Sequence, residues 1–216
     1  MAVLHHAFRC AVTPALEREI ANLLAAWETG DRERLSDMAL ARYTALAERK
    51  DIHAAFYLGP DGAAPSWLQP QFISPGLAAL VVLAKGFVPL PTLSASSDTN
   101  HYQLATQLPA LGWATDEIDC LIRGQPIEAM LQGSAGCAFR LEQGGFRHTG
   151  GWTPGRMART LCTRLDRLAF GPPSQANEAA LVAWSKLNES NALQDARAML
   201  TPLTDDDDWL VMALTH

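Results

Sequence analysis

The residues best suited to chemistry in this sequence are the arginines between Phe139 and Arg167. Six arginines stand in this stretch against two acidic residues, Glu142 and Asp166, which gives a local formal charge of +4 in a chain of net charge −6. A guanidinium is a planar fork that forms two parallel, charge-assisted hydrogen bonds to a carboxylate or a phosphate. This concentration of one side chain therefore predicts a surface that recognises an anion or an acidic partner.

A helix over 153–170 is expected to position most of these arginines, because apolar residues recur at helical spacing on one side of it. We assign the anion-recognising surface to Arg147, Arg156, Arg159 and Arg167. Arg164 lies toward the edge of that face and is expected to contribute less. The alternative is a solvated face, whose arginines cover apolar surface with their stems and pair with acidic residues elsewhere.

A second candidate site is the loop predicted over 88–100, which is long for an internal connection. It contains, or lies next to, the residue types of a hydrolytic triad, and the weak catalytic candidates are Ser94, Ser96, Asp98 and His101. The sequence lacks the Gly-x-Ser-x-Gly elbow that presents a nucleophilic serine on a tight turn. A small hydrolase that uses residues 94–101 is therefore the alternative to a binding function.

Metal and cofactor sites have no support in the sequence. His5 and His6 are neighbours in a predicted strand, so they point to opposite faces. Four consecutive carboxylates at 205–208 lack the alternating ligands of a calcium loop, and we interpret them as a solvated loop that protects a terminal strand from edge pairing. The glycine pairs at 144–145 and 150–151 flank a hairpin instead of leading a strand into a helix. We expect no metal and no cofactor.

The four cysteines are widely spaced and form no Cys-x-x-Cys pair, so we expect free, buried thiols. They are Cys10, Cys120, Cys137 and Cys162.

The predicted fold is α+β: a mainly helical single domain, 1–216, with a small antiparallel sheet. The sheet is expected to contain an N-terminal strand over 4–12 with one buried face, a central hairpin over 139–149 and a C-terminal strand over 209–214. A further short strand is predicted over 54–58. Helices are expected over 14–27, 31–50, 77–85, 101–111, 115–123, 126–133, 153–170, 176–187 and 192–200. Gly171-Pro172-Pro173 is the sharpest break, and it marks a sub-boundary near 171–174.

Composition favours a soluble binding protein. The chain has 216 residues, of which 48% are hydrophobic and 19% charged, as in ordinary globular domains. Its net charge of −6 disfavours nucleic acid and anionic membranes, and no aromatic residues interleave with the arginines as single-stranded nucleic acid would require. The apolar run 77–84 is shorter than the roughly 20 residues of a membrane span, which indicates a buried core helix.

We expect a cytoplasmic protein, because the start of the chain lacks the pattern of a secretory signal. The excess of arginine over lysine is typical of a GC-rich bacterial genome. With catalytic signatures missing, the sequence favours an inhibitor, immunity or accessory protein. Such a protein would bind another protein, or a small ligand that is anionic or bears a phosphate.

Overall fold

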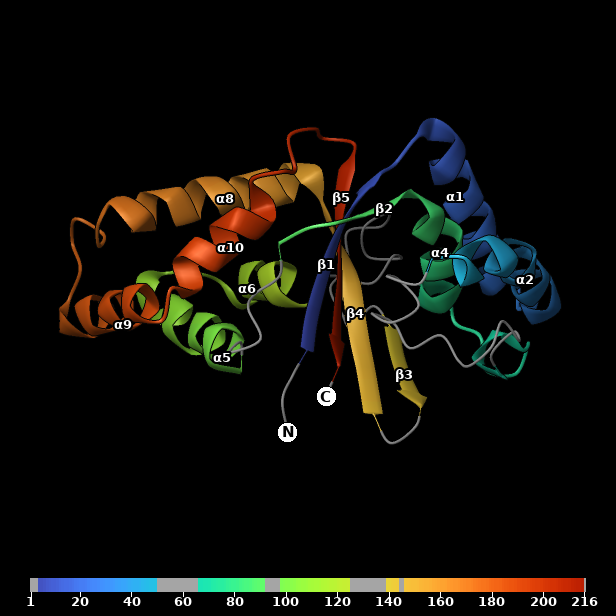
Figure 1. The fold of residues 1–216 in the computed structure, drawn as a ribbon, viewed down its shortest axis with the longest axis horizontal. Helices are drawn as coiled ribbons and strands as arrows, with labels where there is room; N and C mark the ends of the chain where they lie inside the picture. The colour runs from blue at the N-terminus through green and yellow to red at the C-terminus, as the bar shows by residue number, and fades with distance from the viewer. Residues whose placement is uncertain (1–3, 50–65, 92–97, 125–138, 144–145, 216) are drawn as a thin grey trace.

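An antiparallel sheet, whose two central neighbours β1 (Leu4–Ala11) and β5 (Asp208–Thr215) come from the two ends of the chain, forms the middle layer of the structure (Figure 1). The computed structural model describes residues 4–49, 66–91, 98–124, 139–143 and 146–215. In this part of the chain the strand order is β2-β1-β5-β4-β3. The other strands are β2 (Phe87–Pro89), β3 (Phe139–Gln143) and β4 (Phe146–Pro154). β1 pairs with β5 along its whole length, from Leu4 opposite Thr215 to Ala11 opposite Asp208, so the two ends lie side by side.

Helices cover both faces of this sheet (Figure 1). One face is covered by α1 (Pro14–Glu28), α2 (Arg32–Ala47) and α4 (Pro75–Leu83), with the short 3₁₀ helices η1 (Ser66–Leu68) and η2 (Ala84–Gly86). The other face is covered by α5 (Asp98–Gln107), η3 (Leu108–Leu111), α6 (Thr115–Ile122), α8 (Gly155–Phe170), α9 (Glu178–Glu189) and α10 (Ala192–Leu200). The predicted mainly helical α+β class with a small antiparallel sheet is therefore confirmed.

Two hydrophobic cores result, one on each face of the sheet. Phe8 of β1 packs in the core beneath α1, α2 and α4, whereas its neighbour Ala7 packs in the core beneath α8 and α10. Adjacent residues of β5, Val211 and Met212, divide between the two cores in the same way. The expectation that the first strand has one buried face is therefore wrong. A strand covered on both faces carries a nearly continuous apolar run, as β5 does.

The helix starts follow local capping chemistry. Ser74 accepts a hydrogen bond from the Leu77 amide at 3.2 Å, and Pro75 occupies the first helical position of α4. Thr13 and Pro14 begin α1 in the same way. Every residue of α4 is buried, which confirms the prediction of a core helix. Among the described residues no helix has both the length and the apolar character needed to span a membrane.

Two element boundaries and the role of one acidic segment differ from the predictions. The loop expected over 88–100 begins inside β2 and ends inside α5, because Val88 pairs with Arg9 of β1 and helix begins at Asp98. The helix expected from residue 153 begins at Gly155, since β4 continues to Pro154. The acidic run 205–208 does not protect an edge, because β5 is the central strand and Asp208 is buried.

The remaining predictions are settled only where the structure describes the residues. Cys10 and Cys120 are free and buried as expected, and burial raises the pKa of these thiols to about 12 and about 11. Cys162 is free and half-buried. Cys137, the strand at 54–58 and the helix at 126–133 lie outside the described residues. The single domain and the sub-boundary near 171–174 stay predictions, although the indole of Trp184 donates to the Leu168 carbonyl across that break at 2.7 Å.

Candidate functional site

α8 places its side chains in two opposed sets. The buried set recurs every three or four residues and consists of Gly155, Ala158, Leu161, Leu165 and Leu168. The opposite side, which we name the outer stripe of α8, consists of the exposed residues Arg156, Thr160, Thr163, Arg167 and Phe170. This separation confirms the predicted amphipathic helix, with the arginines directed away from the core.

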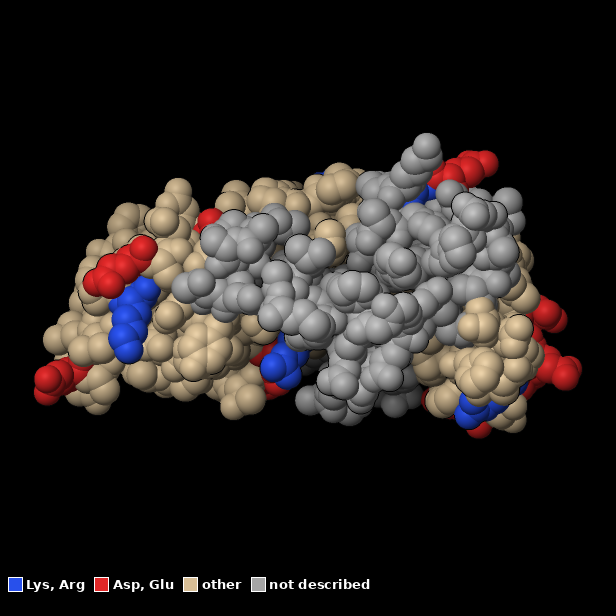
Figure 2. Space-filling model, turned by 60° about the horizontal axis from the view of Figure 1, so that its bottom comes forward, with Lys and Arg blue, Asp and Glu red and all other residues tan. Residues whose placement is uncertain are grey.

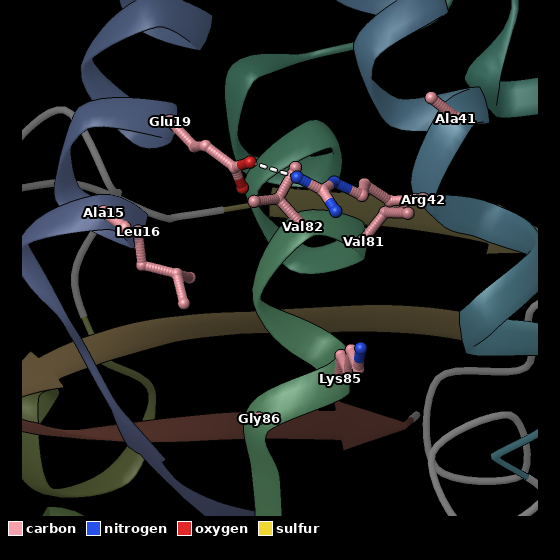
Figure 3. A pocket seen from close by; sticks show the side chains of 9 residues that line it. All are labelled: Ala15, Leu16, Glu19, Ala41, Arg42, Val81, Val82, Lys85 and Gly86. Carbon is pink, nitrogen blue, oxygen red and sulfur yellow. Dashed lines mark hydrogen bonds and ion pairs between the residues drawn. The ribbon is translucent and has the colours of Figure 1, made fainter.

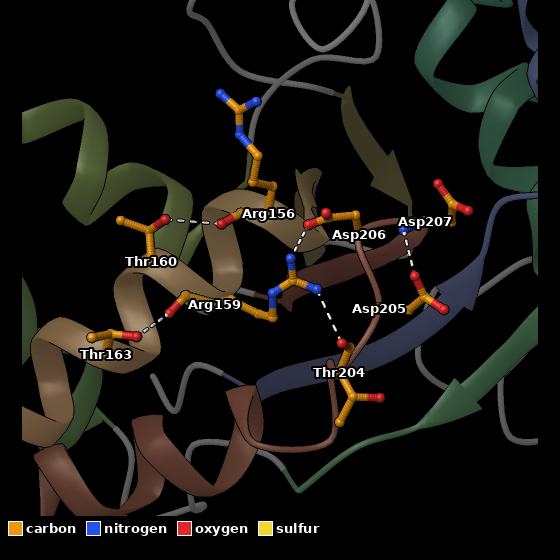
Figure 4. A network of polar contacts seen from close by, with 8 residues as sticks. All are labelled: Arg156, Arg159, Thr160, Thr163, Thr204, Asp205, Asp206 and Asp207. Atoms are coloured by element: carbon orange, nitrogen blue, oxygen red, sulfur yellow. Dashed lines mark hydrogen bonds and ion pairs between the residues drawn. The ribbon is translucent and has the colours of Figure 1, made fainter.

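The first turn of α8 is fixed against the acidic loop that precedes β5 (Figure 4). Gly155 has no room for a side chain, since a Cβ there would lie 2.3 Å from the carbonyl oxygens of both Asp205 and Asp208. Arg159 bridges the same junction: it pairs with the carboxylate of Asp206 and donates to the Thr204 carbonyl at 3.0 Å. Arg159 therefore has an internal structural role.

Arg164 is held by α6 and the turn before it. Its guanidinium pairs with Glu117, donates to the Gly112 carbonyl at 3.1 Å and lies 4.4 Å from the centre of the Trp113 ring. Burial raises the pKa of Glu117, but hydrogen bonds from Arg164 and the Ala114 amide, with the charge of Arg164, outweigh it and hold that pKa below its usual value. Arg164 is thus part of the packing between α6 and α8.

Asp166, the acidic residue within α8, also has a partner in the fold. Asp166 accepts a hydrogen bond from Nε of Arg197 on α10 at 2.6 Å. This bond ties α8 to α10 and leaves Asp166 less able to neutralise its neighbour Arg167.

The outer stripe keeps a positive charge because its arginines lack such partners. Neither Arg156 nor Arg167 pairs with an acidic side chain among the described residues, and Figure 4 shows Arg156 pointing away from Asp206. The hydroxyls of Thr160 and Thr163 donate back to the carbonyls of Arg156 and Arg159, each at 2.9 Å. At the end of the stripe Phe170 is 92% exposed. A helix rise of 1.5 Å per residue separates Arg156 from Arg167 by about 16 Å.

The structure does not bring Arg147 together with the arginines of α8. Arg147 lies in β4 opposite Glu142, near the turn of the hairpin, and α8 follows the other end of β4. About 23 Å of extended strand separates Arg147 from Pro154. β4 thus places Arg147 at the end far from α8, and its expected part in the anion-recognising surface stays a prediction.

The catalytic candidates are only partly described. Asp98 is the first residue of α5, and His101 is half-buried one turn later in the same helix. Ser94 and Ser96 lie outside the described residues, so the geometry of a triad stays untested. In the described ranges, no three His, Cys, Asp or Glu side chains converge as metal ligands.

Other charged residues are dispersed. On the face seen in Figure 2, the described lysines and arginines are few, and acidic side chains lie near several of them. Any positively charged surface must therefore be small and local, as the net charge of −6 predicts.

Sequence reasoning missed a pocket of about 520 Å³ between α1, α2 and α4, on the opposite side of the sheet from α8. Its charged residues are Glu19, Arg42 and Lys85. Each stands alone in its own segment of sequence, and only the packing of three helices brings them together. A motif search has no signal for such a site.

Comparison with protein-family models, curated proteins and solved structures gave no match for this chain. Function is therefore inferred from the geometry and charge of the chain itself.

Proposed function

We propose that this chain is a binding protein that recognises an acidic segment of another protein through the outer stripe of α8. It would act as an inhibitor, immunity or accessory protein in the cytoplasm. The observation that supports this most directly is the difference between the arginines of one helix. Arg159 and Arg164 have carboxylate partners within the fold, whereas Arg156 and Arg167 have none among the described residues.

Phe170 adds an apolar anchor to this charged surface. Its ring is almost fully solvated, although burying such a side chain is worth roughly 1.5–3 kcal/mol. Arginine and aromatic residues dominate the energetics of protein interfaces. The outer stripe has this composition, because Arg156 and Arg167 lie near the two ends of α8 and Phe170 follows Arg167.

The spacing favours an extended partner over a single small anion. One phosphate cannot contact both Arg156 and Arg167, because about 16 Å separates their positions along the helix. An acidic peptide segment, or an acidic helix lying alongside α8, spans that distance. A small phosphate-bearing ligand would instead use one arginine and depend little on the other.

A pair of charge-matched double variants tests this proposal. Arg156→Glu with Arg167→Glu reverses the stripe, while Arg18→Glu with Arg34→Glu makes the same change of charge on exposed arginines of α1 and α2. Each variant is used for affinity capture from the native host, after circular dichroism confirms its fold. We expect the control to retain a stoichiometric acidic protein partner that the stripe variant loses, with capture by the wild type weakening as salt rises. Equal recovery by both variants would overturn the proposal.

The same samples test the hydrolase alternative. A fluorophosphonate probe labels an activated serine, so labelling that disappears on substitution of Ser94 or Ser96 would contradict a purely binding role. The binding proposal expects no such labelling.

A further inference from the structure

The pocket between α1, α2 and α4 has the size of a small-molecule site (Figure 3). Its volume is about 520 Å³, within the 300–1,000 Å³ typical of ligand pockets. Three helices form its walls, with residues 15, 16 and 19 of α1, 41 and 42 of α2, 81 and 82 of α4, and 85 and 86 of η2. It lies on the face of the sheet opposite α8.

Small side chains on two helices create this space. α4 packs against both α1 and α2, but Ala15 and Ala41 stand where the two outer helices border the pocket. The Glu19–Arg42 ion pair joins α1 to α2 above Val82, as Figure 3 shows. The packing of the helices thus sets the shape of the pocket, and the exposed ion pair spans two of its walls.

The lining combines an apolar floor with one uncompensated cation. Val81 and Val82 of α4 form the floor beside Leu16, and Lys85 lies at the end away from the ion pair (Figure 3). Glu19 neutralises Arg42, whereas Lys85 has no acidic partner among the described residues. The lining therefore has a formal charge of +1 within a chain of net charge −6.

Helix dipoles do not alter this sign. The first turn of α1 and the last turn of α4 both border the pocket, so a positive and a negative helix end partly offset each other. Arg49 donates to the carbonyls of Lys85 in η2 and Phe87 in β2, at 3.4 and 2.8 Å. The ammonium of Lys85 is left to attract an anionic group.

We propose that this pocket binds a small amphipathic carboxylate. Its apolar chain would lie on Val81 and Val82, and its carboxylate would pair with Lys85. One uncompensated positive charge matches a carboxylate better than a phosphate, whose second negative charge would lack a partner. This inference does not depend on the proposed function, because the pocket and the outer stripe of α8 lie on opposite faces of the sheet.

Calorimetric titration with octanoate and with 1-octanol tests both halves of the site. The two probes share a chain length and differ in the charged group. Lys85→Met is expected to weaken octanoate binding about tenfold, the effect of losing one charge-assisted hydrogen bond, while changing octanol binding less than about twofold. Lys186→Met, at an exposed lysine of α9, is the matched control and should change neither probe.

Two further variants locate the probe. Ala41→Trp should fill the pocket and abolish binding of both probes. Ala41 is exposed, so the larger side chain should be tolerated. Ala15→Phe serves the same purpose if Ala41→Trp does not fold. Glu19→Gln frees Arg42 and should tighten octanoate binding severalfold. Three results would each overturn the proposal: no octanoate binding at millimolar concentration, binding that survives the filled pocket, or an equal loss of octanoate and octanol affinity in Lys85→Met.

Discussion

α4 and α8 cover opposite faces of one sheet, but they differ in how much of their surface is buried. Every residue of α4 is buried and none is charged, so the whole helix serves the core. α8 buries one side and directs arginines outward from the other. α4 therefore offers only apolar surface to a ligand, at the floor of the pocket beside α1 and α2, whereas the outward side of α8 offers charged groups.

The arginines of α8 extend the comparison to single residues. Arg159 and Arg164 connect α8 to the 204–206 loop and to α6, as structural residues do. Arg156 and Arg167 make no such ion pair within the described residues. Arginines of the same helix thus have different roles. What distinguishes them is whether the fold places an acidic side chain beside them.

The largest expected effects are in the two cores. Leu80→Ala in α4 and Leu161→Ala in α8 remove fully buried side chains, and each should lower the free energy of unfolding by about 2–5 kcal/mol. Leu181→Ala is the control, because Leu181 is 46% exposed. Chemical denaturation measures all three. A loss below about 0.5 kcal/mol at Leu161 would mean that this face of α8 is not packed.

The junction between α8 and the acidic loop should be the next most sensitive place. Gly155→Ala forces a methyl group against two backbone carbonyls, so we expect a loss of about 1–3 kcal/mol in unfolding free energy. Gly171→Ala, at the other end of α8, has an open surrounding and should be close to neutral. Thermal unfolding compares the pair, and equal melting temperatures would contradict the close contact at Gly155.

A smaller difference is expected between a paired and a solvated arginine. Arg164→Met removes a guanidinium shared by Glu117, the Gly112 carbonyl and Trp113, and should cost about 1–2 kcal/mol. Arg167→Met should cost less than about 0.5 kcal/mol. Urea denaturation of both variants checks this order, which would be refuted if Arg167→Met were the more destabilised.

The smallest effect is a pH dependence at the same ion pair. The pKa of Glu117 is lower in the folded chain than its reference value of 4.5, so its ionised form stabilises the fold above that value. This contribution should fade as the pH falls below 4.5 and through the lower folded pKa. Glu117→Gln removes it, so the difference in unfolding free energy between wild type and variant should shrink in acid. A difference independent of pH between 3 and 7 would contradict the assignment.

The sequence predicted these helices well because their signals are local. The unbroken apolar run of α4 and the helical spacing of Leu161, Leu165 and Leu168 need no knowledge of the rest of the chain. Proline and threonine or serine at the starts of α1 and α4 are equally local. The second buried face of β1 was missed because the small side chain of Ala7 gave no apolar signal on that side of the strand.

Non-local partners limited the prediction of the candidate site. Nothing near Arg159 in sequence indicates Asp206, and nothing near Arg164 indicates Glu117, since each partner lies 47 residues away. Arg147 was grouped with α8 because the two are close in sequence, whereas β4 places Arg147 at its end far from α8. β2 was missed because it has three residues and ends in a proline, which is typical of a short edge strand.

Arginine footprinting tests the central claim most directly, namely that α8 separates structural from recognising arginines. Phenylglyoxal is added to the folded wild-type protein, and mass spectrometry follows the modification of each arginine over time. We predict that Arg156 and Arg167 react rapidly and Arg159 and Arg164 slowly, and that a captured partner protects Arg156 and Arg167. Similar rates at all four arginines, or a partner that leaves Arg156 and Arg167 reactive, would contradict the account.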